Sequence, residues 1–358
     1  MTTKEHEILV SIIIPAYNVE KYIGATLESI CRNKLDNVEI IVVDDGSTDN
    51  TRQTVEECLE RLNPPHYKVI RQENKGVSVA RNTGIDNAVG KYLIFCDGDD
   101  LCYPNLVEAI TPSIYSEKNL IVWGFDITQD GRRTNGQGNY AVDAIPEKEV
   151  FKDFLMGQYR IRLGSFAIKK SLLDENNIRF TEGCPLAEDV EFIFKCLSKA
   201  GDTIAVNQTL FTYAKRGGSA MYTYSINRLE VPRVIKRIVD YVADNTDLMA
   251  DDEVRDYLRN GFLIQHAIFA FDACIGYLTN RDRRREFLLT YHDKYSDIEE
   301  ELKRACKAMR IKPTAVSSKK VKLFCMSRSL YVRILSFRMK YLKCLISLSL
   351  RAGYILWR

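Results

Sequence analysis

A strand-like apolar run in this chain ends in three carboxylates within four residues. The run is Tyr92–Cys96, and Asp97-Gly98-Asp99-Asp100 follows it directly. Like charges at the mouth of a sheet repel one another and lose hydration, so they require a cation or a basic partner. Carboxylate oxygens suit Mg²⁺ or Mn²⁺, which proteins often hold between carboxylates and phosphates. The run therefore predicts phosphate chemistry, and the alternative is an Asp/Gly-rich turn that closes a strand.

The first hundred residues alternate strand and helix patterns with short connections. Apolar runs predict strands at 9–14, 38–43, 66–71 and 91–96, with helices expected at 22–30, 48–62 and 77–88. Such alternation builds a mostly parallel sheet, whose ligands bind beyond the carboxyl ends of the strands. Three special loops follow strands in this pattern: Pro15–Asn18, Asp44-Asp45 and Asp97–Asp100. We therefore expect them to meet in one acidic site.

The pattern is looser after residue 101. Strands are expected at 120–125, 166–169, 203–206 and 209–214, residues 129–141 are typical of a polar, Gly-rich loop, and 225–310 predict helices. Ala187–Leu197 has helical periodicity and opens with Glu188 and Asp189. Acids are stabilised at a helix N-terminus, so the structural interpretation of this pair is a favourable helix start.

Composition limits the class of protein. A chain of 358 residues favours one large α/β domain with an appendage. Its ten cysteines are scattered without a Cys-x-x-Cys pair, and the polar segment Met1–Glu7 has no secretory pattern. These features predict a reducing, cytoplasmic location without disulfides or bound zinc.

Charge is distributed unevenly along the chain. No Asp or Glu follows Glu301, whereas 15 of the 51 basic residues lie in 302–358; the preceding residues hold the other 36 basic and all 48 acidic ones. An acidic body with a basic tail predicts that the tail meets an anionic surface.

The tail also has a helical apolar pattern. Residues 328–350 place apolar side chains at steps of three or four, namely Leu330, Ile334, Phe337, Tyr341, Leu345 and Leu348, with basic residues at Arg333, Arg338, Lys340 and Lys343. No stretch of 18 uncharged apolar residues occurs, which disfavours a transmembrane span. We predict a basic amphipathic helix in the lipid headgroup layer, with Trp357 as an interfacial anchor. The alternative is a helix packed on the body, and nucleic acid is a weaker competitor for the tail.

Four ordered motifs resemble those of family 2 glycosyltransferases, which are inverting bacterial enzymes with the GT-A fold. The motifs are Val10–Asn18, Val42–Asp49, Asn74–Asn82 and Asp97–Asp100, and the resemblance covers about residues 8–220. It implies an α/β fold with a Rossmann-like, mostly parallel central sheet flanked by helices and a C-terminal helical extension. The domains expected are a glycosyltransferase domain at 8–224 (nucleotide-binding half 8–100, acceptor half 101–224), a helical extension at 225–310 and a basic amphipathic tail at 311–358.

The resemblance assigns a nucleotide-binding role to the first three motifs. Pro15, Ala16, Tyr17 and Asp45 would line the base and ribose pocket, where a carboxylate accepts the N–H of a uracil or thymine ring. Asp44 ranks below Asp45 for this role, because it could equally be a structural cap. Lys75 and Arg81 would donate hydrogen bonds to the base, ribose or diphosphate, and the alternative for Arg81 is an exposed helix cation.

The resemblance also implies the residues of the reaction. Asp99 would bind a divalent cation, Mg²⁺ or Mn²⁺, that bridges the diphosphate, and Asp97 would contact the ribose or the cation. Asp189, at the end of a segment that resembles the family's acidic pair, would be the general base, with Glu188 as second candidate. Arg216 and Ser219 would contact the diphosphate from a segment that could close over the donor as a lid. This segment carries no His and so is not expected to ligate metal.

Together these assignments predict in-line transfer of a sugar, with inversion, from a UDP- or dTDP-sugar to a hydroxyl of a glycan or polyprenyl-linked acceptor. The resemblance places the reaction in capsule, exopolysaccharide or O-antigen synthesis, on the inner face of the cell membrane. One alternative is a nucleotidyltransferase that makes an activated sugar, but the chain lacks the Gly-rich basic loop expected near its N-terminus. Another is a non-catalytic phosphate or metal-binding module, which would leave the acids at 188 and 189 without a purpose. No G-x-G-x-x-G or G-x-x-x-x-G-K-[ST] pattern occurs, which disfavours dehydrogenases and P-loop ATPases.

Overall fold

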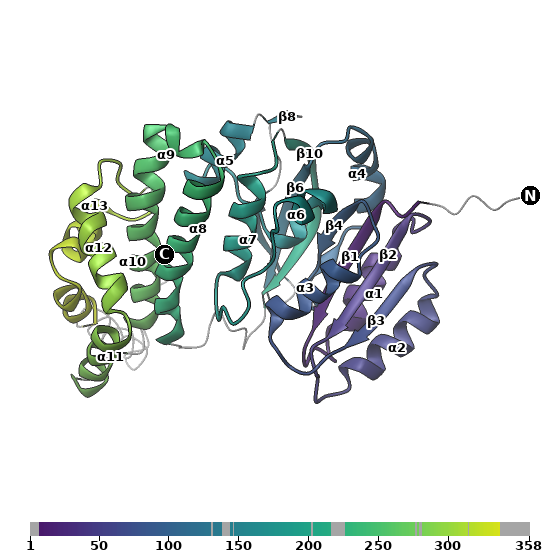
Figure 1. Ribbon diagram of the computed structural model, residues 1–358. Helices are drawn as coiled ribbons and strands as arrows, with labels where there is room; N and C mark the ends of the chain where they lie inside the picture. The colour runs from purple at the N-terminus through teal and green to yellow at the C-terminus, as the bar shows by residue number, and fades with distance from the viewer. Residues whose placement is uncertain are drawn as a thin grey trace, which may run out of the picture. The chain divides into compact units, whose positions relative to one another are not determined.

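The chain folds as two compact units, residues 1–219 and 220–358. The computed structural model describes residues 7–129, 132–137, 144–145, 147–201, 203–215, 226–275, 278, 281–313 and 315–336. The first unit is α/β and the second is helical (Figure 1). The finer division of the first unit into halves at residue 100, and of the second into an extension and a tail, stays a prediction.

The first half of the α/β unit is a regular alternation of strands and helices. The elements are β1 (Val10–Ala16), α1 (Ile23–Cys31), β2 (Val38–Asp44), α2 (Thr51–Leu62), β3 (Tyr67–Arg71), α3 (Val77–Asn87) and β4 (Tyr92–Phe95). The four strands are parallel in the order β3-β2-β1-β4, so their carboxyl ends share one edge. The strands and helices predicted for this half are confirmed.

The second half extends the sheet with mixed directions. Its elements are β5 (Leu101–Cys102), α4 (Leu106–Tyr115), β6 (Leu120–Gln129), β7 (Arg132–Gln137), β8 (Ala144–Ile145), α5 (Glu147–Leu155), η1 (Leu163–Ser165), β9 (Phe166–Lys169), α6 (Lys170–Glu175), α7 (Glu188–Leu197) and β10 (Thr203–Lys215). The sheet continues past β4 as β9-β6-β10-β5. β9 is antiparallel to both of its neighbours, whereas β6 and β10 are parallel to each other.

Two expectations for this half were wrong. The polar segment predicted as a loop contains β7, which pairs antiparallel with β6. Polar side chains do not prevent a strand whose backbone groups are satisfied by an existing neighbour. The strands expected at 203–206 and 209–214 are one strand, β10, with register shifts after Val206 and after Thr209. Such bulges interrupt the alternation of side chains, which makes one strand look like two in the sequence.

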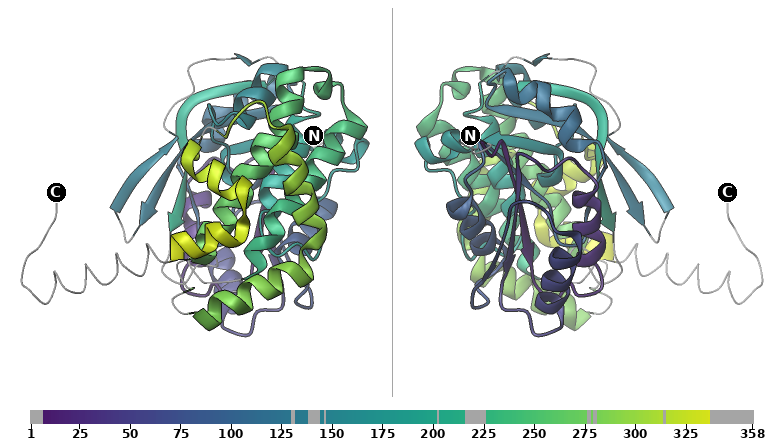
Figure 2. Two further views of the ribbon diagram at one scale, coloured as in Figure 1. Left: turned by 90° about the vertical axis from the view of Figure 1, so that its left-hand side faces the viewer. Right: turned by 90° about the vertical axis from the view of Figure 1, so that its right-hand side faces the viewer.

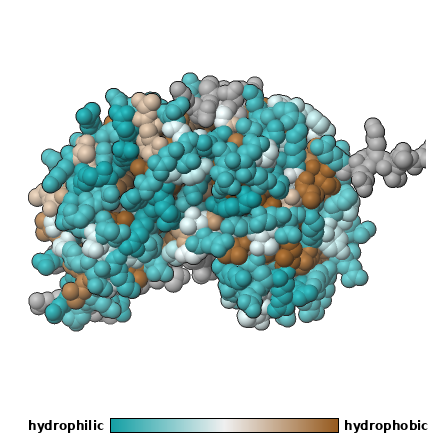
Figure 3. Space-filling view, in the orientation of Figure 1, coloured by the Kyte–Doolittle hydropathy of each residue, from teal (hydrophilic) through white to brown (hydrophobic). Residues whose placement is uncertain are grey.

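Successive side chains of a strand point to opposite faces of its sheet. Helices cover both faces of this sheet (Figures 1 and 2). Ile12, Ile40 and Ile94 belong to a buried cluster with residues of α1, α2 and α4. On the opposite face α3 lies so close to β1 that a methyl group at Gly84 would be 2.3 Å from Cγ2 of Ile13. The face drawn in Figure 3 is mostly hydrophilic, with apolar residues in small separate groups.

The second unit contains helices around an aromatic core. They are η2 (Ile226–Glu230), α8 (Val231–Asn245), η3 (Leu248–Ala250), α9 (Asp252–Asp256), the π-helix η4 (Tyr257–Phe262), α10 (Leu263–Ile275), α11 (Arg281–Lys294), α12 (Ser296–Ala308) and α13 (Ser318–Met326). Residues 328–336 form a further helical stretch. The ring of Phe271 packs edge-on against Tyr291 and Phe324. Among the described residues, no helix combines the length and the apolar content that crossing a bilayer requires.

We expect Gly84→Ala to lower the free energy of unfolding by about 1–3 kcal/mol, because the added methyl group forces Ile13 or α3 to move within a packed core. Urea denaturation of the two proteins measures this difference. Gly24→Ala in α1 is the matched control: its methyl group would lie 3.5 Å from Sγ of Cys58, an ordinary contact. Higher helix propensity should leave that variant unchanged or up to about 1 kcal/mol more stable. Equal unfolding midpoints for both variants would contradict the close approach of α3 to β1.

Candidate active site

Hydrogen bonds connect the loop that follows β1 to the loop that follows β2. Asn18 adopts a left-handed conformation with φ 51°, and its Oδ1 accepts the N–H of Thr48 at 2.9 Å. In return, Oγ of Ser47 accepts the N–H of Asn18 at 3.1 Å, and Oγ1 of Thr51 accepts that of Val19 at 2.7 Å. Ser47, Thr48 and Thr51 therefore shape the edge of the sheet by binding the loop after β1.

The two aspartates at the end of β2 have different surroundings. Asp44 is buried, and its Oδ1 accepts the N–H of Ser47 at 2.9 Å, as in a turn cap. Asp45 accepts the backbone N–H groups of Lys75 and Gly76 at 2.9 and 2.8 Å, and Nε2 of Gln72 at 2.8 Å. Asp45 thus holds the turn that begins α3, where Gly76 has φ 93°.

A cleft of about 260 Å³ opens at the carboxyl edge of the parallel strands. It is lined by Val19 and by residues of all four motifs, namely Pro15, Ala16, Tyr17, Asp45, Asn74, Gly76, Val77, Ala80, Arg81, Asp97, Gly98 and Asp99. The structure therefore brings together all the nucleotide-side and metal residues predicted from sequence, except Lys75. The side chain of Lys75 is exposed, and its backbone N–H is the group that Asp45 holds.

Arg81 reaches from this cleft to the acidic pair of the second half. Its side chain is only 4% exposed. Nη2 donates to Oδ1 of Asp97 at 2.7 Å, and Nη1 donates to Oε1 of Glu188 at 3.0 Å. One guanidinium thus lies between the acidic loop after β4 and the start of α7.

Asn82, the next residue of α3, also contacts the second half. Its side chain accepts the N–H of Phe180 at 2.9 Å and donates to the carbonyl of the same residue at 3.0 Å. The Phe180 ring stacks on Phe192 of α7, with centroids 3.9 Å apart, and meets Phe95 of β4 edge-on at 5.2 Å. These contacts fix the segment that leads to the acidic pair.

Glu188 and Asp189 begin α7 after Ala187, which has a left-handed φ of 63°. Oδ1 of Asp189 accepts the N–H of Val190 at 2.8 Å. Burial and the neighbouring Asp189 raise the pKa of the Glu188 carboxyl, and the ion pair with Arg81 opposes that rise.

Asp100 connects the acidic loop to the end of β10. It is buried, and its Oδ1 accepts the N–H of Ala214 at 2.9 Å. Burial and the nearby Asp97 raise the pKa of Asp100, which favours its protonated form. Arg216 and Ser219, predicted to contact the diphosphate, lie outside the described residues.

No group of three His, Cys, Asp or Glu side chains in the described part of the chain is arranged to hold a metal ion. Asp97 and Asp99 both line the cleft. Two carboxylates beside an open cleft fit a Mg²⁺ or Mn²⁺ ion that takes its remaining oxygens from a diphosphate and from water.

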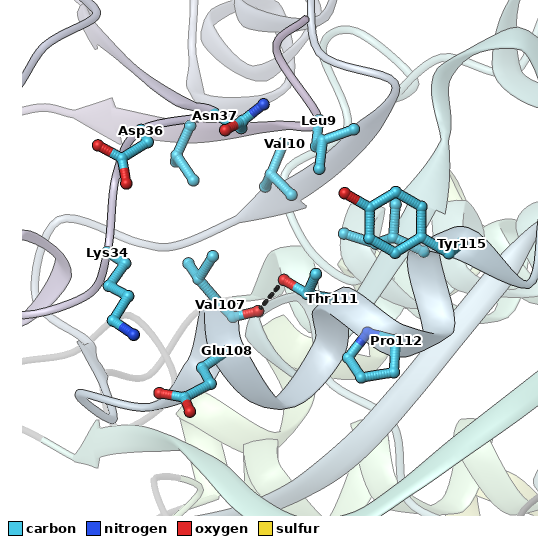
Figure 4. Close-up of a pocket in the computed structure, with 12 residues that line it drawn as sticks. Leu9, Val10, Lys34, Asp36, Asn37, Val107, Glu108, Thr111, Pro112 and Tyr115 are labelled. Atoms are coloured by element: carbon cyan, nitrogen blue, oxygen red, sulfur yellow. Dashed lines mark hydrogen bonds between the residues drawn. The ribbon is translucent and has the colours of Figure 1, made fainter. Parts of the chain in front are cut away.

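A larger cleft of about 310 Å³ lies at the opposite, amino ends of β1 and β2 (Figure 4). Its walls come from Val10, Val38 and the side chains of α4, with Tyr115 at its margin. None of the residues predicted for the site lines it. Ligands of parallel sheets bind at the carboxyl ends, so the smaller cleft is the candidate site.

Comparison with known proteins decides the family. A family model described as Glycosyl transferase family 2 matches residues 11–176. Streptococcus pneumoniae GlyG, named a glycosyltransferase, is 30% identical over 227 residues, which cover 60% of this chain and 73% of GlyG. The chain belongs to glycosyl transferase family 2. This membership confirms the prediction of a glycosyltransferase enzyme. It also decides against the two alternatives, a nucleotidyltransferase and a non-catalytic module.

Two Bacillus subtilis relatives are similar over parts of their length. EpsJ, named an uncharacterized glycosyltransferase, is 30% identical over 216 residues, covering 59% of this chain and 62% of EpsJ. The chain therefore spans less than two thirds of that relative. GgaB, named a minor teichoic acid biosynthesis protein, is 30% identical over 228 residues, covering 61% of this chain and 24% of GgaB.

Two solved structures share the fold. S. aureus TarS in complex with UDP-GlcNAc has a TM-score of 0.69 and 21% identity, covering 98% of this chain and 93% of that one. The Pyrobaculum calidifontis mannosyltransferase PcManGT, in complex with GDP-Man and Mn²⁺, has a TM-score of 0.52 and 15% identity, covering 94% and 87%. The predicted GT-A fold class is confirmed.

Sequence reasoning missed how Arg81, Asn82 and Phe180 join the two halves. A signal for Arg81 was present: on α3 it shares the buried face with Ser78 and Ile85, at helical spacing. No comparable signal pointed to Phe180, because pairing across 98 residues of sequence depends on the tertiary fold.

We expect Asn82→Ala to lower the free energy of unfolding by about 1–3 kcal/mol, because both backbone groups of Phe180 lose their partner in a partly buried site. Asn87→Ala, at the exposed end of the same helix, removes only the hydrogen bond to the carbonyl of Thr83 and should cost about 0.5 kcal/mol or less. Thermal unfolding of both variants gives the comparison. An Asn82 variant as stable as the Asn87 variant would show that the clamp on Phe180 is not formed.

Proposed function

We propose that this protein transfers a sugar, with inversion, from a UDP- or dTDP-sugar to a hydroxyl of a glycan or lipid-linked acceptor. The observation that carries the proposal is the cleft at the carboxyl edge of the sheet, which collects residues of four motifs separated by up to about eighty residues of sequence. TarS, which was crystallised with UDP-GlcNAc, shares the fold over both units of the chain.

The nucleotide half of the cleft offers a wall and a hydrogen-bond acceptor. Tyr17 is 46% exposed at the end of β1 and presents a ring face to a base. Oδ2 of Asp45 has one backbone donor, which leaves a lone pair to accept the N–H of a uracil or thymine ring. In our proposal the exposed side chain of Lys75, which does not line the cleft, remains a candidate donor to the diphosphate.

The metal half of the cleft consists of Asp97 and Asp99. In our proposal Asp99 holds Mg²⁺ or Mn²⁺ and Asp97 supports it through the oxygen that Arg81 does not occupy. A bound divalent cation would neutralise the charge that grows on the departing nucleoside diphosphate. The Mn²⁺ complex of PcManGT, which shares the fold, supports the choice of a divalent cation.

The acid pair supplies the base in our proposal. Glu188 accepts a hydrogen bond from Arg81, whereas Asp189 accepts the backbone N–H of Val190. We therefore assign Asp189 as the general base that takes the proton of the acceptor hydroxyl, and keep Glu188 as the second candidate. Direct attack by that hydroxyl on the anomeric carbon, opposite the diphosphate, gives inversion in one step.

The acceptor proposed is a cell-surface polysaccharide or its lipid-linked precursor. GgaB, a relative by sequence, carries a teichoic acid biosynthesis name. Such an acceptor requires a cytoplasmic enzyme that contacts the inner face of the membrane, and the second unit offers a surface for this contact.

The helical stretch 328–336 has two faces. Tyr331 and Val332 are buried in the second unit, and Arg328 pairs with Glu299 of α12. On the other face of the stretch, Leu330 and Ile334 are 40% and 38% exposed. Met326, at the end of the preceding helix α13, is 75% exposed. Exposed basic residues accompany them: Lys319, Lys322 and Arg333. The stretch is thus packed and also amphipathic, which suits a headgroup layer with anionic lipids. The remainder of the predicted apolar face, from Phe337 onward, lies outside the described residues.

Loss of the metal carboxylate tests the proposed chemistry. We expect Asp99→Ala to lower sugar transfer at least about a thousandfold and to abolish the Mn²⁺ dependence of UDP binding. Transfer is measured with radiolabelled UDP- and dTDP-sugars and bacterial membranes as the acceptor source, and binding by calorimetry with Mn²⁺ or chelator. Asp36→Ala, at the other cleft, is the control and should match the parent protein. Near-normal transfer by the Asp99 variant would rule out its role.

The variant Asp189→Asn distinguishes loss of the general base from loss of donor binding. We expect this variant to bind UDP and Mn²⁺ like the parent protein but to transfer sugar at least about a hundredfold more slowly, because the acceptor hydroxyl keeps its proton. If transfer is retained while Glu188→Gln abolishes it, the base is Glu188.

The membrane surface is tested with point variants, because truncation before α13 would remove Phe324, whose ring packs against Phe271 in the core of the second unit. We expect Leu330→Asp with Ile334→Asp to weaken binding to vesicles of phosphatidylglycerol and phosphatidylcholine about tenfold or more. Leu289→Asp, at a position 60% exposed on α11, is the matched control and should bind like the parent protein. Equal flotation of all three proteins would exclude this surface.

A further inference from the structure

Arg81 is a permanent charge at an interior position of a helix. It lies on the buried face of α3 beside Ala80 and Gly84, and its side chain is 4% exposed. A buried cation is costly unless it is paired and hydrogen-bonded, and removing one partner of a buried pair is strongly destabilising. The packing of α3 therefore requires carboxylates next to this guanidinium.

The two carboxylates come from distant parts of the sequence. Asp97 is 16 residues from Arg81, in the loop after β4, and Glu188 is 107 residues away, at the start of α7. They accept from different nitrogens of one planar group, whose spacing is rigid. Arg81 thus sets the position of one carboxylate relative to the other.

Uncharged contacts hold the same arrangement. Asn82 binds both backbone groups of Phe180, and the guanidinium of Arg81 lies 5.1 Å from the centroid of the Phe180 ring. Phe180 and Phe95 both pack against Phe192, which lies one helical turn after Glu188. The guanidinium therefore acts between two elements that aromatic packing already holds close together.

We propose that Arg81 is a positioning residue that keeps the acid pair Glu188-Asp189 in register with the loop Asp97–Asp99, rather than a direct donor to the nucleotide. The inference rests on the proposed transferase function, in which the loop serves the leaving diphosphate and the pair serves the attacking hydroxyl. Nη1 and Nη2 of Arg81 already donate to protein carboxylates, and Nε is buried, without a hydrogen-bond partner among the described residues, so it is not exposed to a ligand. A misplacement of about 1 Å between reacting groups costs on the order of a hundredfold in rate.

The two roles of Arg81 predict different kinetics. A donor to the nucleotide would lower the affinity for UDP when it is removed. A positioning residue lowers turnover and leaves UDP affinity nearly unchanged, because the cleft wall from Pro15 to Tyr17 and Asp45 stays in place. It also loosens the segment 180–189, which a nucleotide contact would not do.

The experiment compares Arg81→Met, Arg81→Lys and the control Arg61→Met, which removes an exposed pair with Glu28 on α1. Each full-length variant is assayed for UDP affinity with Mn²⁺, for kcat of sugar transfer, and for amide hydrogen exchange of residues 180–189. For Arg81→Met we expect kcat to fall about a hundredfold or more, the Kd of UDP to change less than about threefold, and exchange to become faster. Arg81→Lys should be intermediate, because an ammonium cannot bridge both carboxylates in the same geometry. The control should match the parent protein in all three measurements.

A double variant tests the route through Glu188. Glu188→Gln alone is expected to lower kcat. If Arg81 acts by holding the Glu188 side chain, adding Glu188→Gln to Arg81→Met should lower kcat hardly any further. Independent, multiplying losses would contradict the proposal.

Other outcomes would overturn the proposal. A rise in the Kd of UDP as large as the fall in kcat identifies a nucleotide contact, and unchanged exchange at 180–189 shows that no tether exists. If Arg81→Met does not fold, full kcat in Arg81→Lys would show that bridging is unnecessary. If the parent protein transfers no sugar from any nucleotide donor, the proposed function fails, while the exchange comparison still decides whether Arg81 holds the acid pair.

Discussion

The structure depends on how mutual repulsion among carboxylates is relieved at one edge of a sheet. Those in and around the carboxyl edge of the parallel strands include Asp44, Asp45, Asp97, Asp99, Asp100, Glu188 and Asp189. Backbone N–H groups satisfy Asp45, and burial favours the protonated form of Asp100. Arg81 neutralises the pair of carboxylates that bring the two halves of the first unit together. The repulsion is relieved differently in each of these three cases, and the contacts involved also fix neighbouring loops. The protein's own groups therefore hold the acidic edge in place.

The second unit uses a similar solution in a helical setting. Glu299 of α12 is bound by Arg328 and by the hydroxyl of Tyr291, and these bonds lower the pKa of its carboxyl against the effect of burial. Arg328 thereby ties the stretch 328–336 to the core of the unit. Because one side of that stretch is committed to this core, its exposed residues face away from it. Within the described part of the basic segment after Glu301, Lys319, Lys322 and Arg333 are exposed.

Much of the first unit was predictable from sequence, because local patterns decide it. Buried parallel strands are continuous apolar runs, and the strands around Ile12, Ile40 and Ile94 lie where these runs predicted them. The cleft was predictable as well, since strand order brings the loops to one edge. Contacts set by tertiary structure were not predictable: β7 is polar, the bulges of β10 divide its pattern, and the Phe180 stack joins distant residues. Arg81 was expected to face a nucleotide or solvent; its helical spacing from Ser78 and Ile85 is a signal of burial that this expectation overlooked, and its partners required the fold.

One feature constrains how such a cleft diversifies. The carboxylate of Asp45 lines the cleft and at the same time anchors the turn that starts α3. A substitution there disturbs the start of α3 as well as the cleft wall, so under the proposed function a change of nucleobase at that position would damage the framework. The freedom to vary falls instead to Tyr17 and Val77, whose side chains border the cleft and remain 46% and 38% exposed. Descendants of this sequence that adopt a different nucleoside should differ there while the aspartate stays the same.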